Sequence, residues 1–209
     1  MEVQLSQQPN QLRWKLAKNG EFLVKSMYLD IINASVIPSS KHVWKVKEPL
    51  KIKVFMWFVH KQVILTKDNL AKYNWLGSKC SFRDSDESIR HLFLDCPLTK
   101  ILWRSVHIAF NITPPNSINT LFGTWLDGID VETTRHIRVG VCALLWAVWN
   151  CRNDLNFSRT TNIHFLQVVF RATTLIHMWS LLTQTEAREH LVTGSIRWET
   201  VAWVIFNRF

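Results

Sequence analysis

Glycine and proline are scarce in this sequence of 209 residues, which contains six of each. Chains that stay unfolded are typically poor in apolar residues, whereas 47% of the residues here are hydrophobic and 12% are aromatic. The composition therefore excludes a low-complexity chain and predicts a folded core.

Cysteines and long apolar runs are also few. Cys80, Cys96, Cys142 and Cys151 are too few and too unevenly spaced for a disulfide-rich secreted scaffold. No signal-peptide pattern opens the chain, and the apolar run 139–149 is about half of the roughly 20 residues that a membrane-spanning helix needs. We therefore expect an intracellular protein of the nucleus or the cytoplasm, with no membrane partner.

Sequence signatures of several enzyme classes are absent as well. The chain has no Tyr-x-Asp-Asp polymerase pattern, no glycine-rich phosphate loop, no nucleophile elbow and no paired carboxylates of the kind a nuclease requires. We therefore expect a protein that binds rather than catalyses.

Positive charge is abundant and unevenly spread. The formal net charge is +9 at pH 7, and the segment 41–72 holds eight lysines against two acidic residues. Such a surplus is typical of a surface that faces nucleic-acid phosphates, and a set of solvated helix faces gives the same pattern. The candidate phosphate contacts are Lys41, Lys45, Lys47, Lys51, Lys53 and Lys61.

The apolar spacing predicts a mainly α-helical fold with one small β-hairpin at the N-terminus. Alternating apolar residues on both sides of Asn19-Gly20 predict the hairpin. Apolar residues at helical spacing, with caps and prolines at the ends, predict helices over 25–37, 66–73, 87–95, 97–110, 132–155, 163–191 and 195–209. They also predict a helical block that begins near His42, is interrupted at Pro49 and continues as a helix with Ile52, Phe55, Met56 and Val59 on one face. The double proline at 114–115 favours a boundary between a core module, 1–111, and a helical C-terminal extension, 112–209.

The last predicted helix is apolar on more than one side. Trp198, Ala202 and Ile205 share one stripe, whereas Trp203 and Val204 lie off it. Such a helix is either buried or docks on a partner, so it is a candidate for protein binding.

One cluster of residues indicates site chemistry, because Cys80, His91 and Cys96 fall within 17 residues. Thiolate and imidazole are preferred zinc ligands, and small zinc sites combine such ligands from two segments separated by a loop. The remaining cysteines lie about half a turn out of phase on one helix. We expect those cysteines to be core residues, and we expect His60, His107, His164 and His177 to be structural or surface residues.

The segment 79–103 contains Lys-Cys-Ser-Phe-Arg, then Glu-Ser-Ile-Arg-His-Leu-Phe-Leu-Asp-Cys-Pro and Leu-Trp. It resembles the zinc-binding domain downstream of the reverse transcriptase in plant non-LTR, LINE-type retrotransposons. The resemblance extends in order to the runs 19–28, 43–44, 49–57 and 65–70, and more loosely to 145–154. It implies a stand-alone C-terminal fragment of such an element's polyprotein, with zinc as cofactor and nucleic acid as a sequence-nonspecific partner.

The resemblance also implies four zinc ligands, in the pattern C-x-x-C followed by H-x-x-x-x-C. Cys80, His91 and Cys96 match three of these positions, and Arg83 stands where the second cysteine is expected. A guanidinium stays protonated and has no lone pair for a metal, so one ligand is missing.

Three consequences of the missing ligand stay open at the level of sequence. The site has lost its metal, or a carboxylate of Asp84 or Asp86 replaces the cysteine, or water completes a three-ligand site. We expect the chain to fold without metal in each case, because its helices and many aromatic residues predict a large core.

Two functional interpretations are therefore compatible with the sequence. The first is a non-enzymatic zinc-binding module that contacts RNA or DNA backbone through a basic surface. The second is a degenerate relic, or a protein-interaction module, that has lost its metal site and docks through the C-terminal helix.

Overall fold

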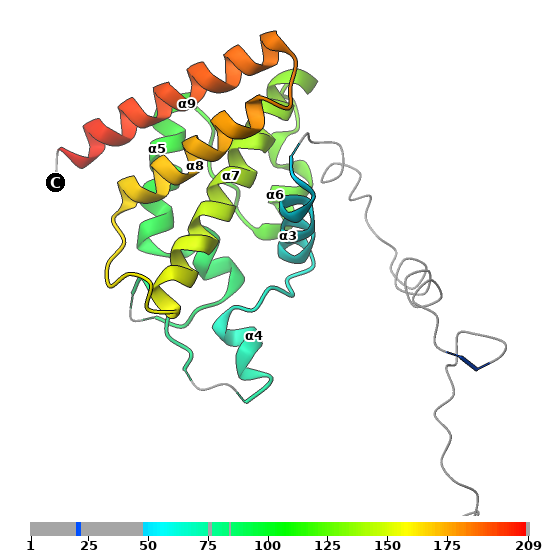
Figure 1. Cartoon of the computed structure of the whole chain (residues 1–209), viewed down its shortest axis with the longest axis vertical. Coiled ribbons are helices and arrows are strands. Elements are labelled where there is room, and N and C mark those ends of the chain that lie inside the picture. Colours follow the sequence, from blue (N-terminus) through cyan, green and yellow to red (C-terminus); the bar gives the residue numbers. More distant parts are fainter. Residues whose placement is uncertain (1–19, 22–47, 75–76, 84, 208–209) are drawn as a thin grey trace, which may run out of the picture. The chain divides into compact units, whose positions relative to one another are not determined.

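The computed structural model describes residues 20–21, 48–74, 77–83 and 85–207. Within these ranges the fold is mainly α-helical, as predicted, and β pairing is confined to an isolated antiparallel bridge between Lys79 and Asp86. The predicted N-terminal hairpin and the helix over 25–37 lie outside the described residues, apart from Gly20 and Glu21. The helices are α3 (Leu50–His60), α4 (Lys67–Ala71), η1 (His91–Asp95), α5 (Pro97–Phe110), α6 (Ile118–Phe122), η2 (Thr124–Leu126), α7 (Val131–Asn156), α8 (Phe165–Ser180) and α9 (Thr185–Phe206) (Figure 1).

Helix α3 starts directly after Pro49, whose carbonyl accepts the first helical hydrogen bond from Ile52 at 2.9 Å. The apolar stripe predicted for this helix is confirmed, because Ile52, Phe55, Met56 and Val59 are all buried. The ring of Phe55 meets Trp146 of α7 edge-on, with centroids 4.9 Å apart. This stripe therefore fastens α3 to α7.

Helix α5 has the bounds that the sequence predicted. Pro97 is its first residue, where the missing amide hydrogen leaves no helical bond unmade. Asn111 ends the helix in the left-handed conformation, at φ 56°. The indole N–H of Trp103 donates to the carbonyl of Phe93 at 2.8 Å and so ties α5 to η1.

Helix α7 runs through the middle of the helical bundle and matches the predicted helix to within one residue at each end. Asp130 caps its N-terminus by accepting hydrogen bonds from the backbone N–H groups of Glu132 and Thr133. Cys142 and Cys151 are buried on it, as predicted for structural cysteines. No helix in the described ranges is long and apolar enough to cross a membrane.

The C-terminal helices break at a different place from the predicted one. The chain turns between α8 and α9 at residues 181–184, where Thr183 Oγ1 donates to the carbonyl of Ser180 at 2.7 Å. The predicted break after Leu191 is wrong, because α9 continues through Gly194. A Cβ at Gly194 would lie 3.7 Å from the ring of Phe110, so packing against α5 overrides the low helix propensity of glycine.

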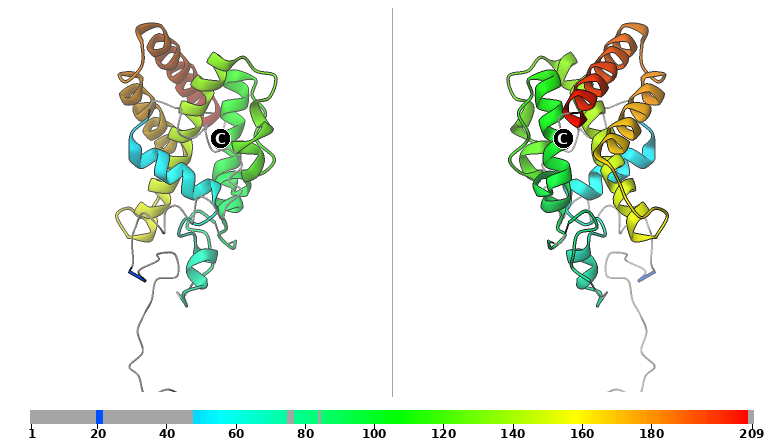
Figure 2. Two further views of the ribbon diagram at one scale, coloured as in Figure 1. Left: turned by 90° about the vertical axis from the view of Figure 1, so that its right-hand side faces the viewer. Right: turned by 90° about the vertical axis from the view of Figure 1, so that its left-hand side faces the viewer.

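The described helices share a single core. Buried apolar side chains from Ile52 to Ile205 form one connected cluster, and the indole of Trp198 in α9 donates to Ser105 Oγ in α5 at 2.7 Å. The side views show α4 near one end of the bundle and the α8–α9 turn at the other (Figure 2). The division at residues 111 and 112 stays a prediction, while the side chains on both sides of it pack together.

A buried ion pair joins the loop before η1 to the end of α7. The carboxylate of Glu87 accepts hydrogen bonds from Arg152 Nε at 3.1 and 3.2 Å and from Arg152 Nη2 at 2.6 Å. The two side chains are only 0% and 5% exposed. The Glu87 carboxylate also accepts from the backbone N–H of Lys67, and Arg152 donates to the carbonyl of Leu65. One pair of charges therefore connects three segments of the chain.

Breaking this pair should destabilise the protein strongly. We expect Arg152→Met to lower the free energy of unfolding by about 3–5 kcal/mol, because it leaves a carboxylate buried without its partner. Urea denaturation followed by circular dichroism measures the change.

Arg90→Met is the matched control for this experiment. Arg90 pairs with Asp95 at 2.8 Å, but the two side chains are 60% and 41% exposed. We expect the control to lose less than about 1 kcal/mol. Equal losses in both variants would contradict the role given to the buried pair.

Candidate metal centre

Cys80, His91 and Cys96 come from three consecutive pieces of backbone. Cys80 lies in the loop between α4 and η1, His91 is the first residue of η1, and Cys96 lies between η1 and α5. Element η1 is a π-helix, closed by a hydrogen bond of 2.7 Å from the backbone N–H of Cys96 to the carbonyl of His91.

The π-turn explains how His91 and Cys96 reach the same side. In an α-helix, residues five apart point about 140° away from each other. A wider turn with an i to i+5 hydrogen bond reduces that angle, and such turns are frequent at functional sites. The spacing H-x-x-x-x-C therefore needs this local departure from the α-helix.

A short backbone turn positions Cys80. Its carbonyl accepts from the N–H of Arg83 at 3.3 Å, and its own N–H donates to the carbonyl of Ser85 at 2.7 Å. The bridge between Lys79 and Asp86 closes the base of this loop. These bonds hold Cys80 opposite His91 and Cys96.

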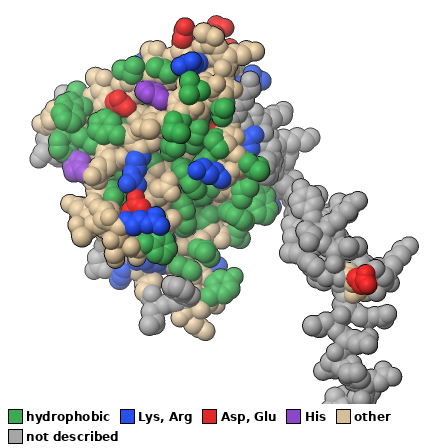
Figure 3. Space-filling model, viewed as in Figure 1, with side chains coloured by type: hydrophobic (Ala, Val, Ile, Leu, Met, Phe, Trp, Pro, Cys, Tyr) green, Lys and Arg blue, Asp and Glu red, His purple; other side chains and the backbone are tan. Residues whose placement is uncertain are grey.

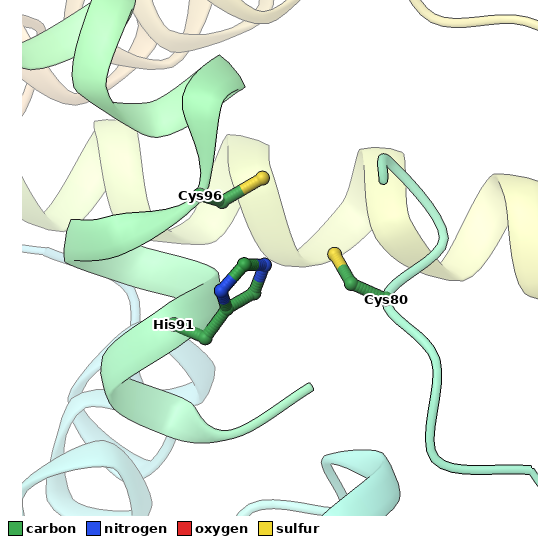
Figure 4. A group of neighbouring side chains, drawn as sticks. All are labelled: Cys80, His91 and Cys96. Carbon is green, nitrogen blue, oxygen red and sulfur yellow. The ribbon is translucent and has the colours of Figure 1, made fainter. Parts of the chain in front are cut away.

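The three side chains converge. One ligand atom from each residue can be chosen so that all three lie within 4.8 Å of one another. The sulfur atoms and the imidazole point toward one another, with the histidine reaching from η1 and Cys80 facing it from the loop (Figure 4). Cys96 is fully buried, Cys80 is buried and His91 is half-buried. Two sulfurs and one imidazole nitrogen suit zinc.

The two thiols influence each other's ionisation. The hydrogen bond with Cys96 lowers the pKa of Cys80, and backbone N–H groups of Phe82 and Arg83 and the His91 side chain act in the same direction. The same hydrogen bond, together with burial, raises the pKa of Cys96. One thiolate is therefore stabilised without a cation, and two thiolates at this distance require positive charge between them.

No carboxylate among the described residues joins the three predicted ligands. Arg83, at the position of the missing cysteine, is exposed. Asp86 accepts from Ser78 Oγ at 2.8 Å and pairs with Lys79 at 3.8 Å, and its side chain is 77% exposed. Asp84 lies outside the described residues.

Three contacts around the site could not be read from the sequence. Glu87, between Cys80 and His91, is held by Arg152, and Ser81 Oγ lies 2.5 Å from the side-chain amide of Asn156. Ser85 Oγ lies 3.1 Å from His91 Nε2. The signal that could have identified the first contact is an arginine in the last turns of an otherwise apolar helix.

The predicted nucleic-acid contacts are described only in part. Lys41, Lys45 and Lys47 lie outside the described residues, whereas Lys51, Lys53 and Lys61 belong to α3 or directly follow it. On the face drawn in Figure 3, basic side chains are interspersed with hydrophobic ones rather than gathered into one patch.

The lysines of α3 do not all share one side of the helix. Lys51 lies over the ring of Trp146, 5.9 Å from its centroid. Lys53, Trp57 and Lys61 are four residues apart, so they form a stripe on the side opposite the buried one. Trp57 is half-buried and its ring lies 5.2 Å from that of Phe58.

Residues 22–103 match the family described as zinc-binding in reverse transcriptase. The match confirms the resemblance predicted from the sequence. A protein of Arabidopsis thaliana named as a ribonuclease H protein is 28% identical over 102 residues, which cover 45% of this chain and 16% of that protein. The match thus spans about a sixth of the relative's length. No solved structure gives a significant match.

We expect the fold to survive without metal, because the candidate site lies in one loop region and the core extends far beyond it. The core cluster extends through α3, α5, α7, α8 and α9, far beyond the loop that carries the three donors. We expect excess EDTA to leave the far-ultraviolet circular dichroism spectrum and the cooperative thermal transition in place. Loss of the helical signal on chelation would show that metal, rather than the core, holds the fold.

Proposed function

We propose that this chain is a retrotransposon-derived, non-enzymatic module that binds one zinc ion through Cys80, His91 and Cys96. The observation that carries the proposal is the convergence of two thiols and an imidazole within 4.8 Å. The family match over residues 22–103 supports zinc as the metal. Bound there, zinc would join the Cys80 loop, η1 and the start of α5.

A structural rather than a catalytic role is supported by the surroundings of the site. Both cysteines are buried, and their backbone positions are fixed by the π-turn and by the short loop. The relative's name refers to ribonuclease H. Metal-dependent nucleases gather carboxylates, whereas the group found in the described part of the chain consists of Cys, His and Cys. We therefore do not extend nuclease activity to this chain.

The zinc content of the purified protein tests this proposal. We expect about one zinc per chain by plasma mass spectrometry, and loss of most of it in Cys96→Ser. Cys151→Ser is the matched control, because it removes another buried thiol that does not belong to the group of three donors. A wild-type chain without zinc, or equal zinc in both variants, would contradict the assignment.

We further propose that the stripe formed by Lys53, Trp57 and Lys61 contacts single-stranded nucleic acid without sequence preference. Lysines one helical turn before and after a partly exposed indole suit a phosphate backbone with an unpaired base stacked on the ring. The formal net charge of +9 favours association with a polyanion. Contact through this stripe would leave the buried stripe of α3 in the core.

Charge reversal tests the nucleic-acid contact. We expect Lys53→Glu with Lys61→Glu to weaken binding to a fluorescent single-stranded RNA and to reduce the slope of log affinity against log salt by about 2. Fluorescence anisotropy at several salt concentrations measures both quantities. The control is Lys100→Glu with Arg104→Glu, on the exposed side of α5, which changes the net charge equally. We expect the affinity of this control to depend more steeply on salt than the affinity of the α3 variant. Identical slopes would contradict the proposal.

The alternative function is protein docking through α9. Ile196, Trp203 and Val204 are 52%, 51% and 46% exposed, and their spacing places them on one side of the helix. The opposite stripe is buried, as predicted, with Trp198, Ala202 and Ile205 in the core. An exposed apolar stripe beside a filled core favours a protein partner there.

A further inference from the structure

We propose that the hydroxyl of Ser85 provides the fourth contact to the zinc ion, in place of the missing cysteine. The observation behind this inference is that Ser85 Oγ lies 3.1 Å from His91 Nε2. Nε2 is the nitrogen that faces the two sulfur atoms in Figure 4. This inference rests on the proposed zinc site, and it names the group that completes it.

The distance is close to the one expected for two ligands of the same ion. Zinc bonds of about 2.0–2.3 Å in a tetrahedron place neighbouring donor atoms about 3.3–3.8 Å apart. The separation between Ser85 Oγ and His91 Nε2 is slightly shorter, which suits a hydroxyl and a nitrogen that share a hydrogen bond when no ion separates them.

The backbone fixes Ser85 at this place. Its carbonyl accepts from the N–H of Cys80 at 2.7 Å, and its N–H donates to the carbonyl of Arg83 at 2.9 Å. The turn that positions the first cysteine therefore also positions the hydroxyl. Arg83 occupies the exposed corner of the same turn.

The carboxylate of Asp86 does not compete with Ser85 for this position. Asp86 is held by Ser78 and Lys79 at the base of the loop, with its side chain 77% exposed. Ser85 is half-buried and faces the histidine. The geometry thus favours a neutral oxygen donor over the Asp86 carboxylate.

The chemistry of these four donor groups determines how strongly the site is expected to bind zinc. Two thiolates, formed by loss of one proton from each cysteine, balance the charge of Zn²⁺, while the imidazole and the hydroxyl stay neutral. A hydroxyl oxygen is a weaker ligand than a thiolate. The site should therefore bind zinc more weakly than a site with three cysteines and one histidine.

Titration of the full chain with Co²⁺, followed by competition with Zn²⁺, tests the assignment. We expect Ser85→Ala to weaken metal affinity roughly tenfold, the size of effect seen when a supporting contact of a metal site is removed. Ser85→Cys should raise the affinity and strengthen the thiolate-to-cobalt charge-transfer band, because a third sulfur enters. Ser78→Ala, a serine of the same loop that bonds Asp86, should match wild type.

The outcomes separate this inference from the zinc proposal. If wild type and Ser85→Ala bind Co²⁺ equally, Ser85 is not the fourth contact, while the three-residue site stands. The same conclusion follows if Asp84→Asn weakens binding and Ser85→Ala does not. If Ser85→Cys leaves the charge-transfer band unchanged, residue 85 does not reach the metal. A wild-type chain that binds neither ion contradicts both proposals.

Discussion

The buried contact between Glu87 and Arg152 is the interaction on which the candidate site depends. Glu87 lies between the first and second predicted ligands, and its carboxylate is fully enclosed. Its charge is balanced by an arginine from the end of α7 and by the backbone N–H of Lys67 at the start of α4. Two charges removed from water are tolerated only with such complete pairing, so the loop has little freedom to move.

The ion pair also joins the region that matches the family to the C-terminal helices. Arg152 belongs to α7, outside the residues 22–103 that match the family. Ser81 makes a second connection to the same helix through Asn156. A structure of the matched region alone would therefore lack the side chains that brace the metal loop.

Local signals predicted much of the fold. Pro97 and the stripe from Ile52 to Val59 each act within a few residues, and α5 and α7 were predicted to within one residue of their observed bounds. The turn between α8 and α9 could not be predicted, because Gly194 stays helical through a contact with Phe110, 84 residues earlier in the chain. Sequence spacing carries no record of such a contact.

The candidate site, like the fold, could be predicted from the sequence only in part. Residue type and order identified Cys80, His91 and Cys96, and the structure brings them together. The π-turn, the contact between Glu87 and Arg152 and the place of Ser85 depend on how the backbone bends, which residue type and order do not reveal. Arg83 removes a ligand without removing the fold, because the helical core extends well beyond the metal loop.

X-ray absorption at the zinc edge of the loaded protein tests the central claim most directly, because it counts the atoms around the ion. We expect two sulfur atoms at about 2.3 Å and two nitrogen or oxygen atoms at about 2.0–2.1 Å from the ion. A first shell without sulfur, or with only one, would show that Cys80 and Cys96 do not hold the metal together and would contradict the account.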